Sequence, residues 1–138
     1  LALGATNSHF VNANGLPDDD HYTTVYDMYL IFQEAVKSQA FVDIIKTKSI
    51  DVTYQDANGN DVNKTWNNTN HYLTGETEAP EGITVIGGKT GTTNAAGYCL
   101  VLYSNNIKGE DIISIVYKSD GRSNMYLLMN QILSTFAN

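Results

Sequence analysis

The residues whose types and spacing suggest chemistry lie between positions 83 and 93. A β-branched apolar run, Ile-Thr-Val-Ile, is followed there by Gly-Gly-Lys-Thr-Gly-Thr-Thr. This pattern predicts a strand whose end carries one cation, Lys89, beside a group of hydroxyl and amide donors, with glycines that leave the backbone open to a ligand. Such groups suit the binding of an anion or a carboxylate at a strand edge.

A phosphate-binding P-loop is one use of such a stretch, because Gly88, Lys89 and Thr90 match its last three residues. That loop needs a glycine six positions before the lysine, directly after a strand, and a helix that starts at the lysine. Position 83 is isoleucine, and the glycine, threonines and asparagine after Thr90 are poor helix formers. Nucleotide binding is therefore kept only as a remote alternative.

The composition indicates a globular chain of one domain, or of part of one. Its 138 residues are 42% hydrophobic and 17% charged, and a net charge of −7 argues against nucleic acid as a partner. The single cysteine, Cys99, excludes an internal disulfide and a cysteine-built metal site. The run Asp18 to Asp20 before His21 is typical of a solvated turn. We expect no metal and no cofactor.

Hydrophobic spacing predicts the elements around the central stretch. Helices are expected over 25–37, with Thr24 as N-cap, and over 40–46, followed by a polar hairpin that pairs 50–54 with 62–66. After residues 83–93, strands at 97–103 and 111–117 complete an antiparallel meander, and this order predicts an α+β fold. A helix over 123–136 should cover the sheet. The residues expected to be buried are Phe41, Ile44 and Ile45 in the second helix, and Met125, Leu128, Met129, Ile132 and Phe136 in the last.

The stretch around Lys89 resembles the Lys-Thr-Gly element of penicillin-recognising serine enzymes. Residues 88–93 with 96–101 are similar to the corresponding segment of D-alanyl-D-alanine carboxypeptidases of the low-molecular-weight penicillin-binding type, peptidase family S11. The resemblance implies an antiparallel sheet flanked by helices, as in part of a β-lactamase/transpeptidase-like domain. It continues in order through residues 3–16, 21–28, 68–73, 112–116 and 121–122, and so spans nearly all of the chain.

The resemblance implies a bacterial serine hydrolase of the cell envelope, outside the cytoplasm. Such an enzyme removes the terminal D-alanine from peptidoglycan stem peptides through an acyl-enzyme, and β-lactams acylate it. Lys89 and the backbone N–H of Thr92 would be catalytic, as a proton-sharing cation beside the nucleophile and as an oxyanion donor. Thr90 and Arg122 would hold the substrate's terminal carboxylate. Gly91 would let an extended peptide pair with the strand edge.

The sequence departs from the family in one respect, which concerns the nucleophile. The mechanism needs Ser-x-x-Lys and Ser-x-Asn ahead of Lys-Thr-Gly, but no serine here has a lysine three positions later. Ser104-Asn105-Asn106 has the second pattern, yet it follows Lys89, so we interpret it as a chance match.

We therefore expect residues 1–138 to be the C-terminal portion of a catalytic domain whose N-terminal part, with the nucleophile, is absent. The signal peptide and the membrane anchor of the full-length protein are also expected to belong to residues outside this sequence. Such a chain should be inactive alone. It should also pair with itself, or with the absent part, through an exposed sheet edge. The alternative from another functional class is a non-catalytic module that binds peptidoglycan peptides.

Overall fold

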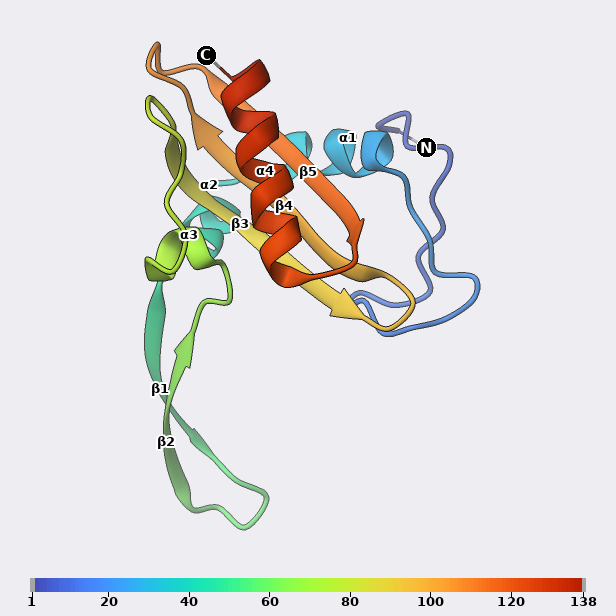
Figure 1. Ribbon diagram of the computed structural model, residues 1–138. Coiled ribbons are helices and arrows are strands. Elements are labelled where there is room, and N and C mark those ends of the chain that lie inside the picture. Colours follow the sequence, from blue (N-terminus) through green and yellow to red (C-terminus); the bar gives the residue numbers. More distant parts are fainter. Residues whose placement is uncertain (1, 138) are drawn as a thin grey trace.

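The computed structural model describes residues 2–137 and places helices on both faces of a three-stranded antiparallel sheet (Figure 1). The helix α4 (Arg122–Phe136) crosses one face, while α1 (Val25–Ala35) and α2 (Gln39–Ile45) lie on the other. The predicted meander and α+β order are confirmed. The strands, in spatial order, are β3 (Thr84–Thr93), β4 (Gly97–Asn105) and β5 (Asp111–Ser119).

The central strand β4 alternates its side chains between two apolar cores. Leu100 and Leu102 are fully buried against α4, whereas Val101 and Tyr103 pack with residues of α1 and α2. This alternation follows from the two-residue period of a strand. Neighbouring residues of β3 must therefore point to opposite faces too, which decides how the candidate site is arranged.

The first helix begins as predicted, and its first turn also anchors the N-terminal loop. The Thr24 hydroxyl accepts the backbone N–H of Asp27 at 3.1 Å. The buried Asp27 carboxylate accepts from the Asn7 backbone N–H and from the Ser8 hydroxyl, each at 2.7 Å. Asp27 thus joins the loop to α1.

Two helices differ from the prediction in which residues they bury. Ile45 is buried as expected, but its neighbour Ile44 is 71% exposed, because a seven-residue helix offers only one narrow face to β3. In α4, Leu128 and Phe136 were wrongly expected in the core and are 43% and 82% exposed. The buried side chains of α4 recur every four residues, with Tyr126 beside them, and the same spacing continues to Ala137 at the C-cap, so Phe136 falls outside it: Met125, Tyr126, Met129, Leu133 and Ala137.

The predicted polar hairpin is present and projects away from the sheet (Figure 1). Its strands β1 (Ser49–Gln55) and β2 (Asp61–Asn67) pair in a continuous antiparallel register from Ser49↔Asn67 to Gln55↔Asp61. A loop then leads to the short helix α3 (His71–Thr74), for which Asn70 is the N-cap. Residues 68–70 of this loop lie against β3 and contribute to the site.

Candidate active site

The strand β3 carries four of the five residues singled out in the sequence. Within the part of the chain that the structure describes, β3 pairs only with β4, so its outer edge is open. Across the ladder Lys89 is opposite Val101, and Thr90 is opposite Leu100. The Lys89 side chain therefore projects on the side of the sheet that α1 and α2 cover, and the Thr90 side chain projects on the side that α4 covers. Lys89 is exposed and Thr90 half-buried, so a ligand at the strand edge can reach both.

The same strand geometry argues against the nucleotide-binding alternative. The strand runs from Thr84 to Thr93, so Lys89 lies within it and not at the start of a helix. A P-loop holds phosphate with the backbone of a loop and the N-terminus of a helix, and β3 provides neither around Lys89.

The glycines of β3 serve two different purposes. A Cβ atom on Gly87 would lie 2.6 Å from the carbonyl oxygen of Ile45, and one on Gly88 would lie 2.4 Å from that of Val101. These two glycines allow α2 and β4 to approach β3 closely. A Cβ on Gly91, by contrast, would meet nothing within 4 Å. The space beside Gly91 is open, as an extended ligand on the strand edge requires.

The positive charge of Lys89 is not neutralised by a carboxylate of the described residues. The ion pairs among residues 2–137 involve Lys37, Lys46 and His71. The Lys89 ammonium group instead donates to the carbonyl oxygen of the adjacent Thr90, at 2.5 Å. A compact cation lying over the backbone of an edge strand is available to an incoming anion.

A second hydroxyl, which the sequence reasoning gave no role, lies against Thr90. The Oγ1 atoms of Thr69 and Thr90 are 2.5 Å apart, although 21 residues separate them in sequence. The loop that carries Thr69 is fixed on both sides: Asn68 donates to the carbonyl of Thr47 at 2.8 Å, and the fully buried Asn70 accepts the backbone N–H of Tyr72 at 3.2 Å. The only sequence signal for this contact is the flanking pair of loop-forming asparagines.

Arg122 lies near the other site residues without joining them directly. It is the exposed first residue of α4 and lines a cavity of about 360 Å³ together with His71, Glu76 and Tyr126, a cavity whose lining does not include Lys89 or any other β3 residue. The end of β3 and the start of α4 nevertheless lie at the same end of the sheet (Figure 1). Tyr126 connects the cavity beside Arg122 with the loop beside β3, since its hydroxyl donates to the carbonyl oxygen of Thr69 at 3.4 Å.

Tyr126 is the second residue that the sequence reasoning missed. Its hydroxyl accepts the backbone N–H of His71 at 2.8 Å, and the two rings stack with centroids 4.7 Å apart. Burial raises the pKa of the Tyr126 hydroxyl above its ordinary value, while the His71 hydrogen bond and the nearby Arg122 charge oppose this rise. The hydroxyl consequently keeps its proton at neutral pH and can donate to Thr69.

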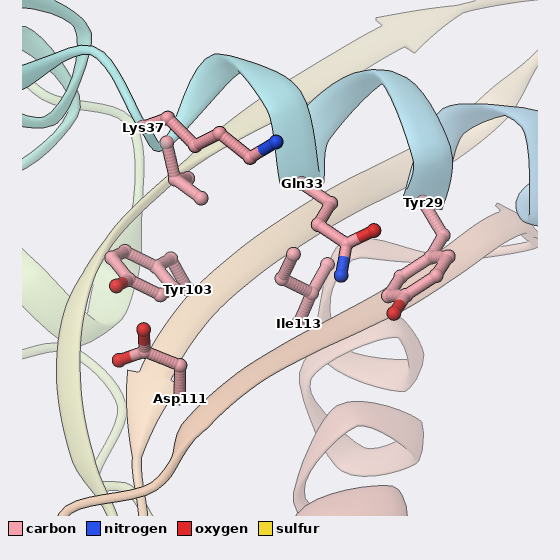
Figure 2. A pocket seen from close by; sticks show the side chains of 7 residues that line it. Tyr29, Gln33, Lys37, Tyr103, Asp111 and Ile113 are labelled. Carbon is pink, nitrogen blue, oxygen red and sulfur yellow. The ribbon is translucent and has the colours of Figure 1, made fainter. Parts of the chain in front are cut away.

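A second cavity, of about 330 Å³, lies between α1 and the sheet. Figure 2 shows Tyr29 and Gln33 of α1, with Lys37 just after that helix, above Tyr103 and Asp111 of the sheet. The Lys37 ammonium pairs with Glu34 in the last turn of α1 at 2.6 Å. The lining does not include any residue that the sequence singled out, so this hollow is a weaker candidate than the edge of β3.

The remaining candidates from the sequence lie elsewhere. Ser104 is buried in β4 opposite Val85, towards the far end of β3 from Thr93, so its Ser-x-Asn pattern does not lie beside Lys89. Among residues 2–137 there is no cluster of three or more His, Cys, Asp or Glu side chains that could hold a metal ion. In the same range, no helix has both the length and the apolar character needed to cross a membrane.

Comparison with known proteins identifies the family. The family model of D-alanyl-D-alanine carboxypeptidase, peptidase S11, matches residues 1–121. The chain belongs to the peptidase S11 family. A curated relative, the D-alanyl-D-alanine carboxypeptidase of Streptomyces sp. (strain K15), is 31% identical over 118 residues, which cover 85% of this chain and 38% of that protein. The resemblance stated from the sequence is confirmed. Arg122 lies just outside the matched residues.

Solved structures of DD-peptidases confirm the transpeptidase-like fold. The crystal structure of Streptomyces K15 DD-transpeptidase matches with a TM-score of 0.82 at 29% identity, over 96% of this chain and 48% of that one. A D-alanyl-D-alanine carboxypeptidase from Mycobacterium tuberculosis H37Rv matches with a TM-score of 0.74 at 22% identity, over 96% of this chain and 48% of that one, which shows a shared fold. The chain thus spans less than half the length of these relatives.

Proposed function

We propose that this chain forms the carboxylate-binding wall of a serine D-Ala-D-Ala carboxypeptidase that trims peptidoglycan stem peptides. The open edge of β3 supports this most directly, because it presents a cation, a hydroxyl and an unobstructed glycine in a member of the S11 family. Thr90 and Arg122 bind the terminal carboxylate of the peptide or of a β-lactam. Gly91 admits the peptide to the strand edge, and the backbone N–H of Thr92 donates to the oxyanion.

In this proposal the nucleophile comes from a segment outside the 138 residues. No serine of the sequence has a lysine three positions later, and the related structure is about twice as long as the part matched here. The chain then corresponds to the C-terminal portion of a catalytic domain in the bacterial envelope. The outer edge of β5 is also unpaired within residues 2–137, so it can bind that segment or a second copy of the chain. Sedimentation at rising protein concentration checks for the second copy.

Purified residues 1–138 are expected to release no D-alanine from an acetylated peptide that ends in D-Ala-D-Ala. Lys89 and the Thr92 N–H stabilise charge in the transition state, but neither can form the acyl bond. A coupled assay for free D-alanine over many hours measures this, with the longer protein as the positive control. Release clearly above that of buffer would contradict the proposed division of the site.

A non-catalytic module that binds peptidoglycan peptides is the second candidate function, and the missing Ser-x-x-Lys favours it. Both candidates use Lys89, Thr90 and Gly91. Fluorescent penicillin distinguishes them when it is added to the longer protein. Covalent labelling that survives denaturation supports the enzyme, and reversible binding without labelling supports the module.

A further inference from the structure

The hydroxyl groups of Thr69 and Thr90 form a pair at the strand edge where the proposed carboxylate site lies. Their oxygen atoms are 2.5 Å apart, so one proton lies between them. Each hydroxyl has only one proton to donate. Whichever threonine donates to the other therefore cannot donate to a ligand through the same proton.

The Thr69 side of this pair is held by its surroundings. The backbone of the loop is fixed by Asn68, whose N–H donates to the carbonyl of Lys48 at 2.8 Å, and by the buried Asn70. The Thr69 carbonyl accepts from the Tyr126 hydroxyl, and Tyr126 is buried between the ring of His71 and that of Tyr72. Thr69 thus reaches Thr90 from a braced segment and not from a free loop.

A bound carboxylate removes the ambiguity about which hydroxyl donates. A carboxylate can only accept hydrogen bonds, so a ligand at Thr90 requires the Thr90 proton to point away from Thr69. The Thr69 proton must then lie on the bond to Thr90. Two hydroxyls in series also polarise one another, which strengthens the terminal donor.

We propose that Thr69 is a positioning residue, whose hydroxyl donates to Thr90 Oγ1 and thereby commits the Thr90 hydroxyl to the terminal carboxylate of the ligand. The inference rests on the proposed function and adds a residue to it. Thr69 acts on the carboxylate only through Thr90. Its effect must therefore depend on the ligand's negative charge and on the presence of the Thr90 hydroxyl.

The test is an NMR titration of the ¹⁵N-labelled chain with N-acetyl-D-Ala-D-Ala and, separately, with the same peptide capped as its C-terminal amide. The variants are Thr69→Val, which keeps the shape and removes the hydroxyl, Thr69→Ser, which keeps the hydroxyl, and Thr90→Val. Thr69→Val should weaken binding of the carboxylate peptide about 5- to 10-fold, since it removes support from a hydrogen bond to a charged group. The amide peptide should change by less than about twofold, and Thr69→Ser should restore the affinity for the carboxylate.

Thr69→Val combined with Thr90→Val separates positioning from general packing. The double variant should bind no more weakly than Thr90→Val alone, because the Thr69 hydroxyl then has nothing to position. Equal weakening of both peptides by Thr69→Val, or unchanged affinity for both, would overturn the role of Thr69 while leaving the proposed function intact. Failure of the parent chain to bind the carboxylate peptide would overturn both. If Thr69→Val does not fold, Thr69→Ala takes its place in every comparison.

Discussion

Replacement of Lys89 by methionine is expected to slow acylation by penicillin at least about 100-fold in the longer protein that carries the nucleophile, the loss typical of removing one electrostatic group from such a site. Methionine keeps the length of the side chain and removes its charge. The ammonium group of Lys89 lies at the open edge of β3 and is not paired with a carboxylate of the described residues, so its charge is available to the ligand and is lost in the variant. Stopped-flow or gel-based labelling with fluorescent penicillin measures the rate constant.

Lys108→Met provides the matched control for this substitution. Lys108 is an exposed cation in the turn between β4 and β5. Its replacement removes the same charge from the molecule without altering β3. The control should keep the parent acylation rate within about twofold, because exposed charges far from a site are screened by salt. Acylation of the Lys89→Met protein at the rate of the control would show that Lys89 has no role in acylation.

Substitution of Gly88 by alanine is expected to destabilise the chain by about 3 kcal/mol, at the upper end of the cost of overpacking. The added Cβ would lie 2.4 Å from the Val101 carbonyl oxygen and 3.2 Å from the Leu102 Cα, and both are backbone atoms of the central strand. Backbone in the middle of a sheet cannot move aside as the end of a flexible side chain can. Urea unfolding followed by far-ultraviolet circular dichroism measures the loss.

Gly91→Ala is the matched control on the same strand. Its Cβ would enter open space, and Gly91 does not adopt a positive φ, so stability should change by less than about 1 kcal/mol. The same methyl group should weaken binding of the acetylated D-Ala-D-Ala peptide, because it occupies the space proposed for the ligand. A fold as stable with alanine at 88 as with alanine at 91 would contradict the packing of β4 against β3.

Local patterns were sufficient to predict the elements that carry the site. The strands around residues 84–119 alternate or run apolar between clear turn residues, and the N-cap at Thr24 is a short-range signal. The central motif could be placed on a strand because its β-branched residues precede the glycines. Lys89, Thr90, Gly91 and Thr92 therefore share one edge strand, as the sequence indicated.

Contacts between distant segments were beyond the reach of such patterns. The approach of Thr69 to Thr90 depends on how the loop after the hairpin docks on β3, and no periodicity encodes that docking. Tyr126 was missed because it lay outside the apolar face expected for the last helix, and because residue spacing does not reveal the partner of its hydroxyl. Phe136 is exposed because of where the helix ends over the sheet, and residue type alone does not specify that end.

The crystal structure of the longer protein in complex with an acetylated D-Ala-D-Ala peptide tests the central claim most directly. The peptide is expected to extend along the outer edge of β3 beside Gly91, with its terminal carboxylate about 2.5–3.0 Å from the Thr90 hydroxyl. The Lys89 ammonium is expected on the same side of the ligand as the nucleophile. A peptide bound in the cavity between α1 and the sheet, with its carboxylate away from Thr90, would show that β3 is not the binding edge.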